Sequence, residues 1–184
     1  MLAGRLDTKF VADFLTLSRA LIAIMLTWLS WFSKSLTLPG AVWLLIASWT
    51  TDLLDGRLAR IGPGKRRTWI GEHDLQIDMA VSGGVLVYLF SSGSVGIWSV
   101  ASYLLIWGLI FWNWGLLRSL GMLFQAPIYG WFLWTAILDR PTVGLWMVLW
   151  VIFAIVLTWP QFTVQVIPEF LAGMKKMFER TSRN

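Results

Sequence analysis

Long stretches without a charged residue are the feature that most limits how this chain can fold. Residues 79–117, 119–138 and 141–168 contain no Asp, Glu, Lys or Arg. A helix needs about 20 mainly apolar residues to cross a bilayer, and the first stretch has room for two spans separated by the Ser- and Gly-rich residues 91–96. Two further apolar runs lie nearer the N-terminus. The sequence therefore predicts an all-α polytopic membrane protein with six transmembrane helices, at residues 13–33, 38–60, 68–91, 96–117, 119–138 and 142–160.

The composition supports this class of protein and excludes others. Hydrophobic residues make up 57% of the 184 residues and charged residues only 14%, whereas soluble domains carry about 25% charged residues. The chain has no Cys, and its one His is His73. A Cys-ligated zinc site and a site with several imidazole ligands are therefore both excluded. The length fits a single domain over residues 1–184.

The basic residues are unevenly divided between the two sides that six spans define. Thirteen of the 15 Lys and Arg residues fall on the side that holds both termini, and only Lys34 and Arg140 fall on the other. Because basic loops stay in the cytoplasm, we expect both termini and the loop 60–67 to be cytoplasmic in a protein of the bacterial inner membrane. The net charge of +5 is spread between apolar spans, which favours anionic lipid and argues against a nucleic-acid partner.

Both ends of the chain show the pattern of amphipathic helices that lie at a membrane surface. Apolar residues recur beside Arg5 and Lys9 at the N-terminus, and opposite Lys175, Lys176 and Arg180 at the C-terminus. Such helices bury their apolar face at the headgroup boundary. The two apolar stripes are Leu2, Leu6, Phe10 and Phe14, and Ile167, Phe170, Leu171, Met174 and Phe178.

Four aspartates lie within the predicted second and third spans. Asp52 and Asp55 are three residues apart, and Asp74 and Asp78 are four apart, so each pair shares one helix face. An ionised carboxylate inside a bilayer costs at least about 2.5 kcal/mol and is a functional candidate by default. Since a short connection joins the two spans, we expect the four carboxylates to meet near the cytoplasmic side.

Four carboxylates at that depth repel one another unless divalent cations neutralise them. Oxygen ligands favour Mg²⁺ or Mn²⁺, and two such ions would suit four carboxylates. In phosphoryl transfer, two metal ions stabilise the departing oxygen, so the predicted substrate is a diphosphate. Gly56 and Ala59 leave one helix face nearly bare, which either lets a diphosphate approach the backbone or serves helix packing.

The four acids belong to a longer pattern. It reads Asp52-Leu-Leu-Asp55-Gly56-Arg-Leu-Ala59-Arg60, followed by Asp74-Leu-Gln-Ile-Asp78. This pattern resembles the signature of the CDP-alcohol phosphatidyltransferase family, D-x-x-D-G-x-x-A-R and then G-x-x-x-D-x-x-x-D. The segment Asp13-Phe-Leu-Thr16-Leu-Ser-Arg19 also resembles the one that opens the first helix in that family. The chain departs from the signature at the second Gly, where it has Ile70 with Gly71 one position later, and its spacer is one residue longer.

The resemblance implies a reaction and a role for each acid. In that family the four acids bind two divalent metal ions, so Asp52, Asp55, Asp74 and Asp78 are the implied ligands. Asp78 is also the implied base that deprotonates the acceptor hydroxyl. The implied activity is transfer of a phosphatidyl group from a CDP-linked lipid, such as CDP-diacylglycerol, to a small alcohol with release of CMP. The family further implies a homodimer.

The substrate-binding residues follow in the same way. By resemblance, Gly56, Ala59 and Arg60 line the site of the CDP moiety. A phosphorylated acceptor such as glycerol 3-phosphate needs a further basic group, and Arg118 is the candidate on the cytoplasmic side. Two other functions stay open: a small divalent-cation transporter, whose acids would be spread along a path through several spans, and a catalytically inactive membrane scaffold of the same family.

Overall fold

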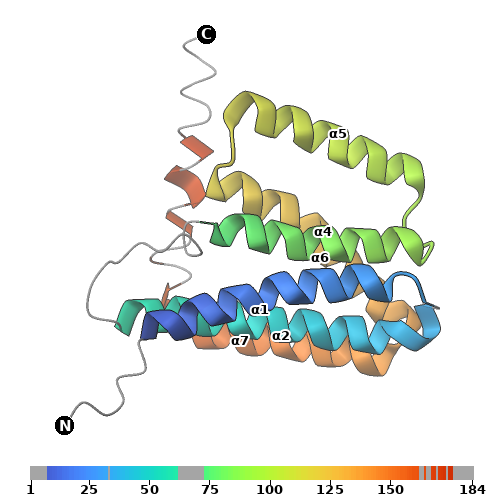
Figure 1. Cartoon of the computed structure of the whole chain (residues 1–184), viewed down its shortest axis with the longest axis horizontal. Coiled ribbons are helices and arrows are strands. Elements are labelled where there is room, and N and C mark those ends of the chain that lie inside the picture. Colours follow the sequence, from blue (N-terminus) through green and yellow to red (C-terminus); the bar gives the residue numbers. More distant parts are fainter. Residues whose placement is uncertain are drawn as a thin grey trace. The chain divides into compact units, whose positions relative to one another are not determined.

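The computed structural model describes residues 8–32, 34–61 and 73–161, and also residues 164, 167–168, 170–172 and 174–175. All regular secondary structure in this part is helical, which confirms the all-α prediction. Figure 1 shows the described helices α1 (Thr8–Leu29), α2 (Lys34–Ile61), α4 (Asp74–Ser91), α5 (Ile97–Trp114), α6 (Arg118–Asp139) and α7 (Pro141–Gln161). The chain divides into two compact units, Met1–Ser92 and Gly93–Asn184.

The helices of the second unit begin and end within three residues of the predicted spans, whereas those of the first unit are displaced by four to six residues at one or both ends. α1 gives way after Leu29 to a turn, in which the Ser30 N–H donates to the Thr27 carbonyl at 3.2 Å and the Phe32 N–H to the Leu29 carbonyl at 3.1 Å. α2 begins at Lys34 although Pro39 lies inside it, since a proline there removes only one backbone hydrogen bond. α4 begins at Asp74 rather than at 68, directly after His73, and residues 62–72 lie outside the described part.

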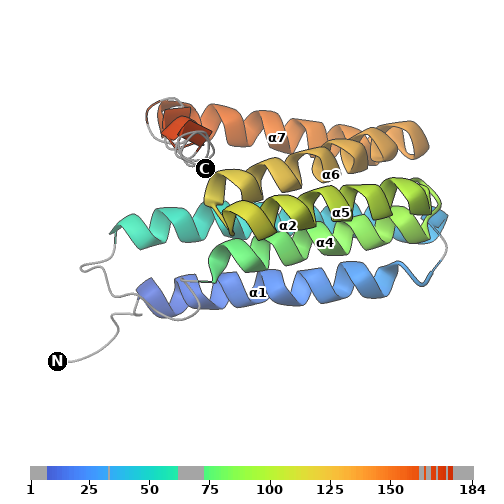
Figure 2. The same ribbon diagram turned by 90° about the horizontal axis from the view of Figure 1, so that it is seen from above.

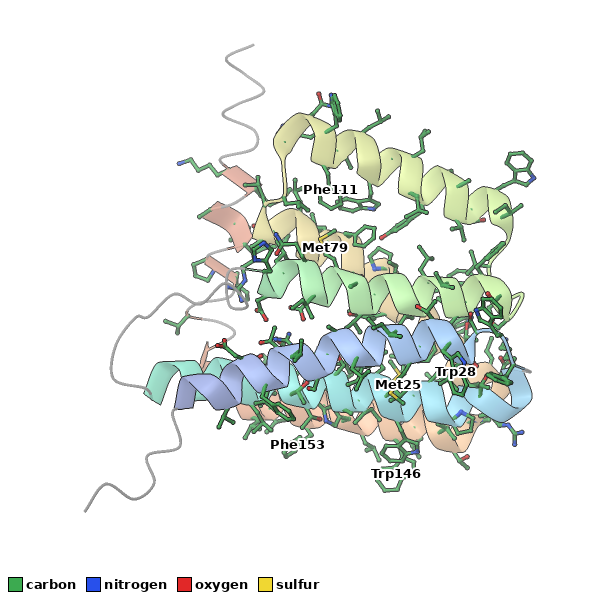
Figure 3. All side chains as sticks on the ribbon, viewed as in Figure 1. Met25, Trp28, Met79, Phe111, Trp146 and Phe153 are labelled. Atoms are coloured by element: carbon green, nitrogen blue, oxygen red, sulfur yellow. The ribbon has the colours of Figure 1, made fainter. Side chains whose placement is uncertain are left out.

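Among the described residues, three helices are long and apolar enough to cross a membrane, all in the second unit: Ile97–Trp114, Arg118–Asp139 and Pro141–Trp159. Large apolar side chains on these helices are exposed. Trp146 and Phe153 point outward from α7 (Figure 3) and are 57% and 59% exposed. Because a water-soluble protein rarely leaves such continuous apolar surface uncovered, these helices have the length and surface of membrane spans.

In the first unit, α1 is the helix on which the other two pack. It lies along α2 and along α4, as Figures 1 and 2 show, while α2 and α4 contact each other much less. A side-chain Cβ at Gly84 of α4 would lie 2.8 Å from the carbonyl oxygen of Ala23 in α1, so only glycine permits this close approach. The buried hydroxyls of Thr37 and Tyr88 join α2 to α4 by a hydrogen bond of 3.0 Å.

In the second unit, aromatic side chains join α5 to α6. The ring of Phe124 in α6 lies 5.6 to 5.8 Å from the rings of Tyr103, Trp107 and Phe111 in α5, and these three recur every fourth residue on one face of α5. The Tyr103 hydroxyl also donates to the Phe124 carbonyl. Edge and tilted ring pairs at this spacing are favourable, so the contact between α5 and α6 is built mainly from ring packing.

The predicted surface helices at the two ends lie largely outside the described residues. Residues 1–7 and 176–184 are not described, nor is the side chain of Phe10. Near the C-terminus, Ile167 and Leu171 are exposed, and the Ser119 hydroxyl donates to the Phe170 carbonyl at 3.3 Å. A position at the membrane surface stays a prediction for both ends.

Candidate metal centre

One guanidinium group in the first unit contacts all four aspartates that the sequence singled out. Nη1 of Arg19 donates to Asp52 Oδ1 at 2.7 Å and to Asp78 Oδ1, and Nη2 donates to Asp55 Oδ2 at 2.5 Å and to Asp74 Oδ1. The Arg19 side chain is 0% exposed. The predicted meeting of the two acid pairs is therefore present, and it is centred on a residue of α1.

The helix positions of the acids explain how they converge. Asp52 and Asp55 lie on α2 with a separation of three residues, and Asp74 and Asp78 lie on α4 with a separation of four, so each pair projects from one face of its helix. Asp74 is in the first turn of α4, where the positive end of the helix dipole favours a carboxylate. Both acid-bearing faces are turned towards α1.

Thr16 extends the site by one helical turn along α1. Its hydroxyl donates to Asp55 Oδ2 at 3.3 Å and accepts from Arg19 Nη2 at 3.3 Å. Asp55 is accordingly the most buried of the four acids, whereas the side chain of Asp52 is 54% exposed. The site thus has a closed end at Asp55 and an accessible end at Asp52.

Three of the acids have the spacing of a cation site. One carboxylate oxygen from each of Asp52, Asp74 and Asp78 lies within 4.8 Å of the others. Oxygen ligands on opposite sides of one Mg²⁺ are separated by about 4.2 Å, so small side-chain movements would bring these three oxygens onto one ion. Asp55 is outside this group, and its Oδ2 accepts hydrogen bonds from Thr16 and Arg19.

The charge balance of the cluster also fits a divalent cation. Arg19 supplies one positive charge against the four negative charges of the carboxylates. Carboxylate oxygen is the ligand type that Mg²⁺ and Mn²⁺ prefer. The carboxylate ligands therefore fit the predicted Mg²⁺ or Mn²⁺. The three acids grouped within 4.8 Å of one another are Asp52, Asp74 and Asp78.

The contacts described for this cluster include none of the other predicted site residues. Gly56, Ala59 and Arg60 belong to the last turns of α2, and their side chains lie outside the described residues. Arg118 is the first residue of α6 and is exposed in the second unit. The roles of these four residues in binding CDP and acceptor stay predictions.

Arg19 is the site residue that reasoning from the sequence did not assign. It is one of the 13 basic residues that the six-span topology places on the cytoplasmic side, although it interrupts an otherwise apolar run from Phe14 to Phe32. The cost of burying a charge in a bilayer applies to Arg as much as to Asp. That rule, applied to both signs, would have marked Arg19 as the partner of the four acids.

Comparisons of the chain with family models, with curated proteins and with solved structures find no match.

Proposed function

We propose that this chain is a membrane enzyme that transfers a phosphatidyl group from a CDP-linked lipid to a hydroxyl acceptor and releases CMP. The observation that carries the proposal is the convergence of Asp52, Asp55, Asp74 and Asp78 on one point in the first unit. The same four acids occupy the acidic positions of the sequence pattern that resembles the signature of the CDP-alcohol phosphatidyltransferases. Both lines of support concern the same side chains, although one comes from sequence order and the other from geometry.

Asp78 is the proposed catalytic residue. Its carboxylate accepts the proton of the acceptor hydroxyl, and the acceptor oxygen forms a bond to the β-phosphorus of the CDP-linked lipid as the bond from that phosphorus to CMP breaks. Asp52, Asp55, Asp74 and Asp78 are the proposed metal ligands. Two bound Mg²⁺ or Mn²⁺ ions would supply charge neutralisation for the diphosphate and for the departing phosphate.

The exposure of the acids supports access of a substrate from one end of the site. Asp52 is the most exposed of the four, and Asp78 lies one helical turn into α4 from Asp74. Gly56, Ala59 and Arg60 follow Asp55 along α2, and we assign them to the CDP moiety. Arg118 is assigned to a phosphorylated acceptor, for which glycerol 3-phosphate is the first candidate.

The membrane setting is part of the proposal. α1 has 22 residues, about 33 Å of helix, and its exposed apolar side chains form one stripe opposite its buried face. A stripe of this kind faces lipid in a helix that spans a bilayer. We therefore propose six spans, a single catalytic domain, both termini and the site in the cytoplasm, and a homodimer. The exposed stripe of α1 consists of Phe14, Leu17, Leu21, Ile24, Met25 and Trp28.

CMP release tests the proposal. The protein is purified in detergent and given CDP-diacylglycerol, Mg²⁺ or Mn²⁺, and a panel of acceptors that includes glycerol 3-phosphate, inositol phosphate and unphosphorylated alcohols. The expected result is CMP release that needs both an acceptor and the divalent ion, and that stops on addition of a chelator. The acceptor that supports release identifies the headgroup.

A silent panel would contradict the proposal if the same protein sample is folded and binds Mn²⁺. Uptake of Mn²⁺ into liposomes containing the protein would then favour transport of the cation. Absence of both activities would favour the scaffold function.

A further inference from the structure

We propose that Arg19 is a positioning residue that acts as the internal counter-ion of the acid cluster and holds the carboxylates of α2 and α4 in the arrangement that the proposed reaction needs. The inference rests on the metal-dependent function proposed above and adds to it a residue from a third helix. It assigns to α1 a part in building the site.

The hydrogen-bond pattern of the guanidinium carries the proposal. Nη1 contacts Asp52 of α2 and Asp78 of α4, and Nη2 contacts Asp55 of α2 and Asp74 of α4. Each terminal nitrogen therefore connects the same two helices. The planar fork of Arg holds two acceptors at each end in a fixed geometry, so the pairing across the helices depends on the shape of this side chain as well as on its charge.

The packing of the first unit shows why such a link is needed. α2 and α4 each pack extensively on α1 but contact each other little. The close approach of Gly84 to Ala23 holds α4 against α1 one turn beyond Arg19. With the backbone of α1 placed in this way, Arg19 reaches the acids of both neighbours, and the direct contacts between α2 and α4 are too few to align them.

Electrostatics gives the same conclusion. Four carboxylates whose oxygens lie within hydrogen-bond distance of one guanidinium repel one another. Arg19 offsets part of this repulsion and contacts only Oδ1 of Asp52, Asp74 and Asp78. A carboxylate has a second oxygen, so contact with Arg19 is compatible with ligation of a cation by the same side chain.

Thermal unfolding of the full-length protein in detergent tests the proposal, with wild type, Arg19→Gln and Arg19→Lys each measured in chelator and in millimolar Mg²⁺. In chelator, Arg19→Gln should lower Tm by on the order of 10 °C, because the four clustered acids lose their shared counter-ion. Mg²⁺ should restore more than about half of that loss and should raise the Tm of wild type much less. Arg140→Gln, which removes the same charge from the second unit, is the matched control and should show neither effect.

Arg19→Lys separates charge from geometry. Lysine keeps one positive charge but has a single terminal nitrogen, so it should recover most of the stability in chelator. It should not restore the arrangement of the acids, and kcat at saturating Mg²⁺ should stay at least about tenfold below wild type while the Mg²⁺ concentration for half-maximal rate changes less. A lysine variant with full kcat would overturn the positioning role.

If Arg19→Gln does not fold, the double variant Arg19→Gln with Asp74→Asn keeps the proposal testable. It removes one charge of each sign, so it should be more stable in chelator than Arg19→Gln alone. Equal Tm values for wild type and Arg19→Gln in both conditions would overturn the proposal, as would a double variant no more stable than the single one. The Tm comparisons, unlike kcat, do not need turnover, so they decide the counter-ion role of Arg19 even if a failure to release CMP overturns phosphatidyl transfer.

Discussion

The described helices of both units pack through apolar side chains, but the two units differ in what they add to that packing. In the first unit, buried polar links also join the helices: Arg19 with four aspartates, and Thr37 with Tyr88. In the second unit the link between α5 and α6 is a group of aromatic rings around Phe124. Among the described residues, the helices long and apolar enough to span a membrane are all in the second unit.

The ion cluster of the first unit needs an explanation other than stability. Buried ion clusters are weak sources of stability, because desolvation of the charges offsets much of their attraction. A chain that needed only to remain in a membrane could rely on ring and aliphatic packing throughout. The ion cluster within the otherwise largely aliphatic interior of the first unit is therefore better explained by a site than by stability.

The rate of CMP release should distinguish an acid of the first unit from an acid of the second. Asp78→Asn in the first unit should reduce CMP release by about 10³-fold, in the range for loss of a general base, while the fold is kept. Asp139→Asn makes the same change at the end of α6 and should leave the rate within about twofold. Steady-state rates with the best acceptor provide the measurement, and equal losses in both variants would remove Asp78 from the role of base.

Ring packing in the second unit can be tested by removing its central ring. Phe124→Ala should destabilise the protein by about 3 kcal/mol, because it deletes the partner of three rings on α5. The difference in Tm between chelator and Mg²⁺ should not change. If this difference disappears in Phe124→Ala, the cation site does not belong to the first unit alone.

The close contact between α1 and α4 predicts opposite results for two adjacent glycines. Gly84→Ala places a Cβ 2.8 Å from a backbone carbonyl oxygen and should cost about 2 kcal/mol of stability. Gly83 has open space around its Cβ position, so Gly83→Ala should be neutral or stabilising by up to about 1 kcal/mol. Thermal unfolding in detergent compares the two variants, and equal Tm values would refute the close approach.

A smaller difference in stability is expected when the hydroxyl of one tyrosine is removed from each unit. Tyr88→Phe removes the hydrogen bond between the buried hydroxyls of Tyr88 and Thr37 and should cost about 1 kcal/mol. Tyr103→Phe removes a hydrogen bond to a helix carbonyl but keeps the ring, so its cost should be below about 0.5 kcal/mol. A reversed order of the two Tm losses would contradict the contrast between polar and aromatic packing.

The parts of the fold that depend on one helix at a time were predictable from the sequence. The uncharged runs around 97–114, 119–138 and 141–159 are long enough to define helices by themselves, and the described helices match them closely. The spacings of three and four residues placed each pair of acids on one helix face, and both pairs do reach one point.

The parts that depend on packing between helices were not predictable in the same way. The apolar pattern of α1 does not show that Arg19 points between α2 and α4, since that direction follows from contacts such as Gly84 against Ala23. Asp55, which lies outside the group of Asp52, Asp74 and Asp78, accepts a hydrogen bond from Thr16, 39 residues earlier in the chain. Periodicity describes one helix, whereas these features need the mutual placement of three.

Mn²⁺ binding, followed by electron paramagnetic resonance of the purified protein, tests whether the acids of α2 and α4 together form a divalent-cation site in the first unit. Wild type and Asp139→Asn should bind Mn²⁺ alike, and Asp52→Asn and Asp78→Asn should each weaken binding by at least about tenfold. Equal binding by all four proteins, or no binding by folded wild type, would contradict this assignment.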